Sequence, residues 1–202
     1  MDAAQSPEDA IYKYVTEDKD KILGMAKAHE YYPVVKERLL TEFWETVEKK
    51  LHDKFKEDDN WRIDKTSAMN EPSSKLYVYS NEFELVEHNN LPPFFFGFEN
   101  LQYYPYYGIW INRGDDKFDD EKVIKVRSKF NNQKSMMTLG ERGEWWLSWR
   151  HINGLDLSRE SNIVNLLPEE REQKSEMMVE ELSKLIESSN KELTRIFNEN
   201  KS

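Results

Sequence analysis

Residues 91–111, LPPFFFGFENLQYYPYYGIWI, are unusually rich in aromatic side chains. Nine of these 21 residues are Phe, Tyr or Trp, whereas the whole chain is 13% aromatic. Aromatic side chains bury large areas and favour the pleated, half-buried surface of a strand. Two such stretches, 94–98 and 106–112, flank a polar turn and predict neighbouring strands at the centre of a sheet. A sheet face of this kind serves either as plain core or as a recognition surface.

The spacing of apolar residues changes along the chain. Ser6 and Pro7 are typical of a helix start, and apolar residues then recur at helical spacing up to residue 57. Tyr31-Tyr32-Pro33 predicts a break, with Pro33 opening a second helix, because proline fits the first turn of a helix. Alternating patterns predict strands at 61–66 and 76–80, and aromatic-rich runs predict strands at 94–98, 106–112 and 144–152, while 123–130 fits a strand or a helix. A long amphipathic helix is expected from residue 169 to 198.

This order of elements predicts one α+β domain over residues 1–202. N-terminal helices (7–57) precede a sheet region (61–152), which a single C-terminal helix (169–198) follows. We expect a curved antiparallel sheet of about five strands with the helices packed on it, since helices and strands are segregated along the chain.

Composition restricts the chemistry that the chain can perform. The formal net charge is −10, and there is no cysteine, which removes disulfides, thiolate catalysis and Cys-based metal sites. The N-terminal residues do not resemble a signal peptide, and no run approaches the roughly 20 apolar residues that cross a bilayer. We therefore expect a cytoplasmic protein with no membrane association and no cofactor. Neither a phosphate-binding glycine loop nor a Gly-x-Ser-x-Gly motif occurs.

Several short motifs carry a family resemblance. They are Phe43-Trp44 on a helix, the strand start Trp61-Arg62-Ile63, Phe96-Gly97-Phe98-Glu99, Tyr106-Tyr107-Gly108-Ile109, and the Trp145–Trp149 strand before a long closing helix. Over residues 33–198 this pattern resembles the C-terminal α+β accessory region of bacterial PD-(D/E)XK nuclease superfamily proteins. The resemblance implies a role in bacterial or phage DNA defence.

The nuclease active site itself is not recognisable. It requires an Asp at one strand end and an acid-x-Lys on the next strand, where two carboxylates hold Mg²⁺. Of the acid-x-Lys tripeptides, Glu17-Asp18-Lys19, Glu48-Lys49-Lys50 and Glu172-Gln173-Lys174 lie on predicted helices, and Asp120-Glu121-Lys122 lies in an acidic turn. We therefore expect a non-catalytic recognition or accessory domain that binds a protein partner. A degenerate Mg²⁺-dependent nuclease around residues 115–122 is the least favoured alternative.

A separation of charge suggests a second alternative. Residues 82–121 carry a formal −7 and residues 122–150 a formal +5. Bases beside exposed aromatic rings suit single-stranded nucleic acid, because cations meet phosphates and rings stack on bases. The residues predicted to do so are Lys125, Arg127, Lys129, Trp146 and Arg150.

The protein-interaction hypothesis uses the aromatic sheet instead, with Phe95, Tyr103, Tyr104 and Tyr107 as partner-binding residues. The oligomeric state is left open by the sequence. Five acids in one turn could bind a cation, but their spacing does not fit a calcium loop, so solvated loop residues are the favoured interpretation. They are Asp115, Asp116, Asp119, Asp120 and Glu121.

Overall fold

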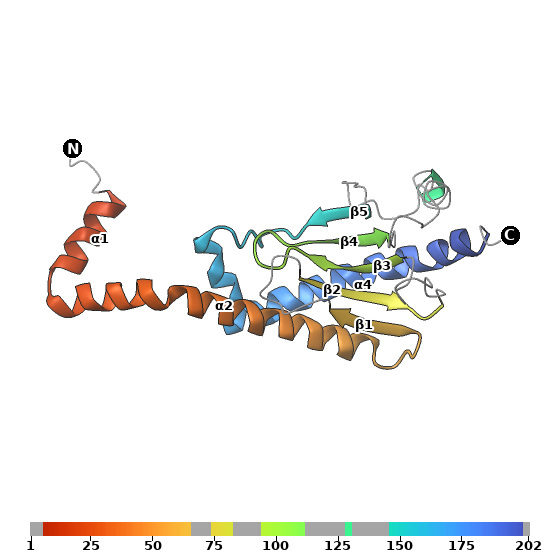
Figure 1. Ribbon diagram of the computed structural model, residues 1–202, viewed down its shortest axis with the longest axis horizontal. Coiled ribbons are helices and arrows are strands. Elements are labelled where there is room, and N and C mark those ends of the chain that lie inside the picture. The colour runs from red at the N-terminus through yellow and green to blue at the C-terminus, as the bar shows by residue number, and fades with distance from the viewer. Residues whose placement is uncertain (1–5, 66–73, 83–93, 112–127, 131–145, 200–202) are drawn as a thin grey trace. The chain divides into compact units, whose positions relative to one another are not determined.

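Two helices whose first turns are capped by side chains precede the sheet. The computed structural model describes residues 6–65, 74–82, 94–111, 128–130 and 146–199 (Figure 1). Helix α1 (Pro7–Thr16) follows Ser6, whose hydroxyl accepts a hydrogen bond from the Asp9 N–H at 3.2 Å. Helix α2 (Lys19–Phe55) follows Asp18, whose carboxylate accepts one from the Lys21 N–H at 2.8 Å. Both contacts satisfy donors that a helix start leaves unpaired.

The predicted break at Tyr31–Pro33 is wrong. Helix α2 runs through Pro33, and the break lies instead between Thr16 and Lys19. Proline inside a helix removes one hydrogen bond and costs about 3 kcal/mol, a local cost that a helix of 37 residues accommodates. None of the helices in the described residues has a stretch long and apolar enough to cross a membrane.

The chain forms two compact units, residues 1–39 and residues 40–202, and each is described by itself. The second unit holds a five-stranded antiparallel sheet in the order β1-β2-β3-β4-β5, so each strand pairs with its neighbours in sequence. The predicted α+β class is confirmed. The strands are β1 (Trp61–Lys65), β2 (Lys75–Ser80), β3 (Phe94–Glu99), β4 (Tyr106–Ile111) and β5 (Trp146–His151). A short 3₁₀ helix, η1 (Glu160–Leu166), precedes the long helix α4 (Pro168–Glu199).

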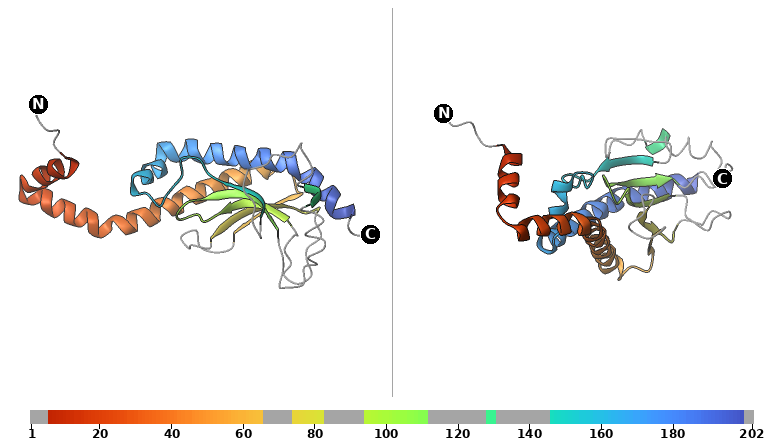
Figure 2. Two further views of the ribbon diagram at one scale, coloured as in Figure 1. Left: turned by 90° about the horizontal axis from the view of Figure 1, so that it is seen from above. Right: turned by 60° about the vertical axis from the view of Figure 1, so that its left-hand side comes forward.

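One face of the sheet packs against helices, and we call it the inner face. Helix α4 and residues 40–55 of α2 lie side by side over it (Figure 2). Trp44 is fully buried there, 5.8 Å from Phe98 between ring centres, and its Nε1–H donates to the Leu101 carbonyl at 3.0 Å. Ion pairs link the two helices: Lys50 lies 2.7 Å from Glu176. We call the opposite face the outer face.

Two glycines face each other at the middle of the sheet. Gly97 of β3 pairs with Gly108 of β4. A Cβ on Gly97 would lie 2.5 Å from the Leu76 carbonyl oxygen, and a Cβ on Gly108 would lie 2.8 Å from the Trp149 Cα. Both obstacles belong to the backbones of neighbouring strands and cannot rotate away. Glycine is therefore required at both positions by the close approach of the strands.

We expect Gly97→Ala and Gly108→Ala each to lower the free energy of unfolding by about 1–3 kcal/mol, because the added methyl forces strands apart. Gly24→Ala is the matched control. Apart from the neighbouring residues and nearby backbone of the same helix, no described atom lies within 4 Å of a Cβ added there, and alanine inside a helix should raise stability by about 0.5–1 kcal/mol. Urea denaturation measures all three variants. Unchanged stability in the sheet variants would contradict the steric account.

Candidate functional site

The residues predicted to bind nucleic acid fall into two groups. Lys125 and Arg127 lie outside the described residues. Lys129 is described, and its Nζ lies 2.7 Å from the Glu199 carboxylate. This lysine is therefore already paired with an acid at the end of α4.

Trp146 and Arg150 lie on opposite faces of the sheet. Trp146 is 9% exposed and stacks on Trp110 of the outer face, with ring centres 6.0 Å apart. Arg150 is directed to the inner face: its Nε donates to the Tyr107 hydroxyl at 2.6 Å, and its guanidinium lies 3.5 Å from Glu181 of α4. The structure does not bring these two residues to one surface.

A register shift separates this pair. Ile109 pairs with Ser148, but the next residue of β4, Trp110, pairs with Trp146, so Leu147 is an extra residue in β5. One extra residue reverses which face the following side chains occupy. Residues 146 and 150 would share a face in a regular strand and are divided by this bulge.

The predicted partner-binding residues are also divided. Phe95 is buried on the outer face, and Tyr107 is buried on the inner face beside Phe98. Tyr103 and Tyr104 are 47% and 38% exposed in the turn after β3. Only these two are available to a partner.

The five acids weighed as a cation site lie outside the described residues. Elsewhere, the described part of the chain contains no group of three or more His, Asp or Glu side chains that could hold a metal ion.

The outer face carries a row of polar residues that crosses four strands. Lys75 pairs in register with Glu99, Glu99 with Tyr106, and Tyr106 with His151. Lys75 Nζ lies 3.3 Å from Glu99 and 3.1 Å from the centre of the Trp110 ring. Burial lowers the pKa of Lys75, and the charge of Glu99 opposes that shift. The Lys75 ammonium contacts both a carboxylate and an aromatic ring. We therefore infer that this row of residues stabilises the observed register of the strands.

Buried tyrosines lie next to this row. Tyr77, Tyr79 and Phe95 form a cluster against which Trp110 packs. Burial raises the pKa of Tyr77 to about 12, with smaller contributions from Asp64 and Tyr79. On the inner face, burial raises the pKa of Tyr107 to about 12, with the charge of Glu181 adding to the shift and that of Arg150 opposing it.

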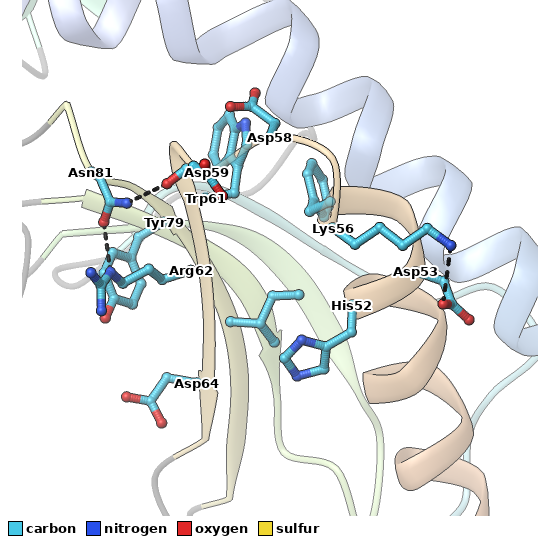
Figure 3. Close-up of a pocket in the computed structure, with 12 residues that line it drawn as sticks. His52, Asp53, Lys56, Asp58, Asp59, Trp61, Arg62, Asp64, Tyr79 and Asn81 are labelled. Carbon is cyan, nitrogen blue, oxygen red and sulfur yellow. Dashed lines mark hydrogen bonds and ion pairs between the residues drawn. The ribbon is translucent and has the colours of Figure 1, made fainter.

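A hollow of about 700 Å³ runs along the free edge of β1. It lies between the last turn of α2 and the end of β2 (Figure 3). Both sets of β1 side chains line it: Trp61 and Ile63 from one face, Arg62 and Asp64 from the other. Figure 3 shows Arg62 and Asp64 on one side of the strand and His52 on the other. A hollow lined from both faces follows the edge of the strand and does not lie under either face.

Within the described part of the chain, the backbone at this edge has hydrogen-bonding groups that no other strand pairs. Strand β1 ends the order of the sheet and pairs only with β2 among the described strands. The Asn81 N–H donates to the Asn60 carbonyl at 2.6 Å, and antiparallel pairing alternates along a strand. The N–H and C=O of Ile63 therefore point away from β2. The Lys65 N–H also points outward, and it donates to the Asp64 carboxylate at 2.8 Å.

The charge around the hollow is mainly acidic. Four aspartates and two bases line it, together with His52. Arg62 donates to the Asn81 side chain at 2.8 Å, which fixes it against the β2 end of the hollow. Lys56 is 3.7 Å from Asp53. The lining acids are Asp53, Asp58, Asp59 and Asp64.

Sequence reasoning did not identify this hollow. The helical pattern up to residue 57 and the strand predicted at 61–66 flank the acidic run 57–60, but neither pattern indicates a site there. A signal was present, because charged residues on both faces of a short strand are typical of a sheet edge.

The buried tyrosines predict a pH dependence. A folded-state pKa near 12, above the ordinary 10, means that the stability contributed by these hydroxyls is complete below pH 10 and is lost as pH rises to 12. We expect the free energy of unfolding to fall progressively over this interval and the fall to be smaller in Tyr77→Phe. Urea denaturation at several pH values measures it. A free energy of unfolding that stays constant from pH 10 to 12 would contradict the burial of both hydroxyls.

Comparisons with known proteins identify no relative. No protein-family model matches the chain, and neither a curated protein nor a solved structure matches it.

Proposed function

We propose that residues 40–202 form a non-catalytic recognition module that binds a protein partner by adding an extended segment of that partner to the edge of β1. The observation that carries this proposal is the hollow that follows the free edge and is lined from both faces of the strand. Strand addition of this kind takes its affinity from backbone hydrogen bonds and its specificity from side-chain pockets.

The geometry of an added strand fits the hollow. Neighbouring strands lie about 4.8 Å apart, and Ile63 supplies an outward N–H and C=O at the centre of the edge. The side chains of an added strand alternate between two sides. One set would lie beside His52 and Phe55 at the end of α2, and the other beside Arg62 and Tyr79.

The charge of the hollow selects the partner. Four aspartates against Lys56 and Arg62 favour a segment that carries lysine or arginine. The apolar side chains of Phe55, Trp61 and Ile63 favour apolar residues between those bases. The preferred partner is therefore an extended segment in which basic and apolar residues alternate.

The DNA-defence setting is proposed on the short motifs of the sequence alone. In that setting the module would hold a nuclease or another defence protein in place and would perform no cleavage itself.

The test uses two labelled eight-residue peptides, one of alternating Lys and Val and one of alternating Glu and Val, followed by fluorescence anisotropy. We expect the basic peptide to bind with a Kd that rises steeply with salt, and the acidic peptide not to bind. Ile63→Pro removes the outward N–H and should raise the Kd at least tenfold, whereas Ile63→Val keeps it and should bind as the parent does. Failure of both peptides to bind would overturn the proposal.

A charge-reversal variant separates loss of binding from loss of folding. Asp59 and Asp64 are exposed, so Asp59→Lys/Asp64→Lys should keep the melting temperature within a few degrees. The variant should no longer bind the basic peptide and should bind the acidic peptide instead. Retained preference for the basic peptide would place its binding elsewhere and contradict the edge site.

A further inference from the structure

The N-terminal unit exposes an unusual amount of apolar surface. Nine large apolar side chains between residues 11 and 35 are 45–71% exposed. They are Ile11, Tyr12, Tyr14, Ile22, Leu23, Met25, Tyr31, Val34 and Val35. No residue between 6 and 39 is buried, so the two helical segments of this unit do not cover each other.

Helix α1 is too short to be stable as an isolated helix. It has 10 residues and no buried side chain, and isolated helices shorter than about 12–15 residues are marginal in water. Ile11, Tyr14 and Val15 lie on one side of it by helical spacing. A helix with such a stripe is maintained when the stripe packs against another surface.

The two segments of this unit carry opposite charge. Residues 6–18, which include α1, hold four acids against Lys13, a formal −3. Residues 19–39 of α2 hold five bases against three acids, a formal +2. Lys21 of α2 lies 4.2 Å from the centre of the Tyr14 ring and pairs with Glu17, but no side chain of α1 is buried against the α2 segment of its own chain. The surface that fits α1 in both charge and apolar character is therefore that segment in a second copy.

We propose that residues 6–39 form a homodimerisation element, in which α1 of each copy packs on residues 19–39 of the other. Such a reciprocal exchange is a closed two-fold interface, the commonest form of homo-oligomer. The nine exposed side chains offer on the order of 1,000 Å² per chain. Those on α2 are spread around the helix, so the part on one side of each helix is smaller than the roughly 800 Å² per partner of a standard interface, which predicts a reversible dimer. This surface is separate from the β1 edge and does not depend on the function proposed above.

The first test is the mass of the full chain by sedimentation equilibrium over a range of micromolar concentrations. We expect a monomer–dimer equilibrium in the parent and at least a tenfold higher dissociation constant in Ile11→Glu/Tyr14→Glu. Thr16→Ser is the control, since it lies on the opposite side of α1 and should dimerise as the parent does. A parent that is monomeric throughout, or a dimer that the double variant leaves unchanged, would overturn the proposal.

A charge-swap experiment tests the exchange itself. Glu8→Lys/Asp9→Lys places bases on α1, and Lys27→Glu/Arg38→Glu places acids on one side of α2 by helical spacing, so each variant alone should dimerise poorly. Mixed together they should form a heterodimer, because both of its α1–α2 contacts then join opposite charges. Circular dichroism confirms that each variant is folded. Folded variants that fail to recover dimerisation on mixing would contradict the exchange.

Discussion

The burial of Trp44 fixes the geometry on which the rest of residues 40–202 depends. Its indole is fully buried between α2 and β3, and its N–H is held by the Leu101 carbonyl after β3. A buried indole with a satisfied N–H combines a large apolar area with a directional contact. The contact sets the position of α2 along the sheet, and therefore where α2 ends. Phe55 then packs 5.4 Å from Trp61 at the start of β1, and the hollow lies beside this contact.

Strands β3 and β4 were predictable because aromatic residues are concentrated in them, and aromatic residues favour strands. Aromatic residues at 94–98 and 106–112 indicated β3 and β4, and the structure confirms strands at both places. The helix boundary was not predictable from Pro33 alone, because the signal that starts α2 is the Asp18 carboxylate, one acid among several. Propensity identified a residue that weakens a helix, whereas capping determined where the helix begins.

The candidate site was harder to predict because a face assignment fails after any inserted residue. Trp146 and Arg150 have the spacing of one strand face, and the bulge at Leu147 divides them. Charge separation along the chain was also a poor guide to exposed charge. Lys129 and Arg150 pair with Glu199 and Glu181 of α4, which are distant in sequence. A basic run can therefore be neutralised by a helix that sequence proximity does not associate with it.

The charges on β1 affect both its pairing with a second copy of itself and its pairing with another protein. Charged residues on an edge strand discourage unwanted pairing, yet two antiparallel copies of β1 centred on Ile63 would set Arg62 opposite Asp64. Arg62 uses its Nε on Asn81, and Asp64 accepts from the Lys65 N–H, so self-pairing would set an arginine that is already held at Nε opposite this carboxylate. A lysine or arginine of a foreign strand would approach the other oxygen of Asp64 without being held in this way. The charge of β1 therefore agrees with the proposed foreign basic strand, and the proposed dimer of residues 6–39 uses no residue of this edge.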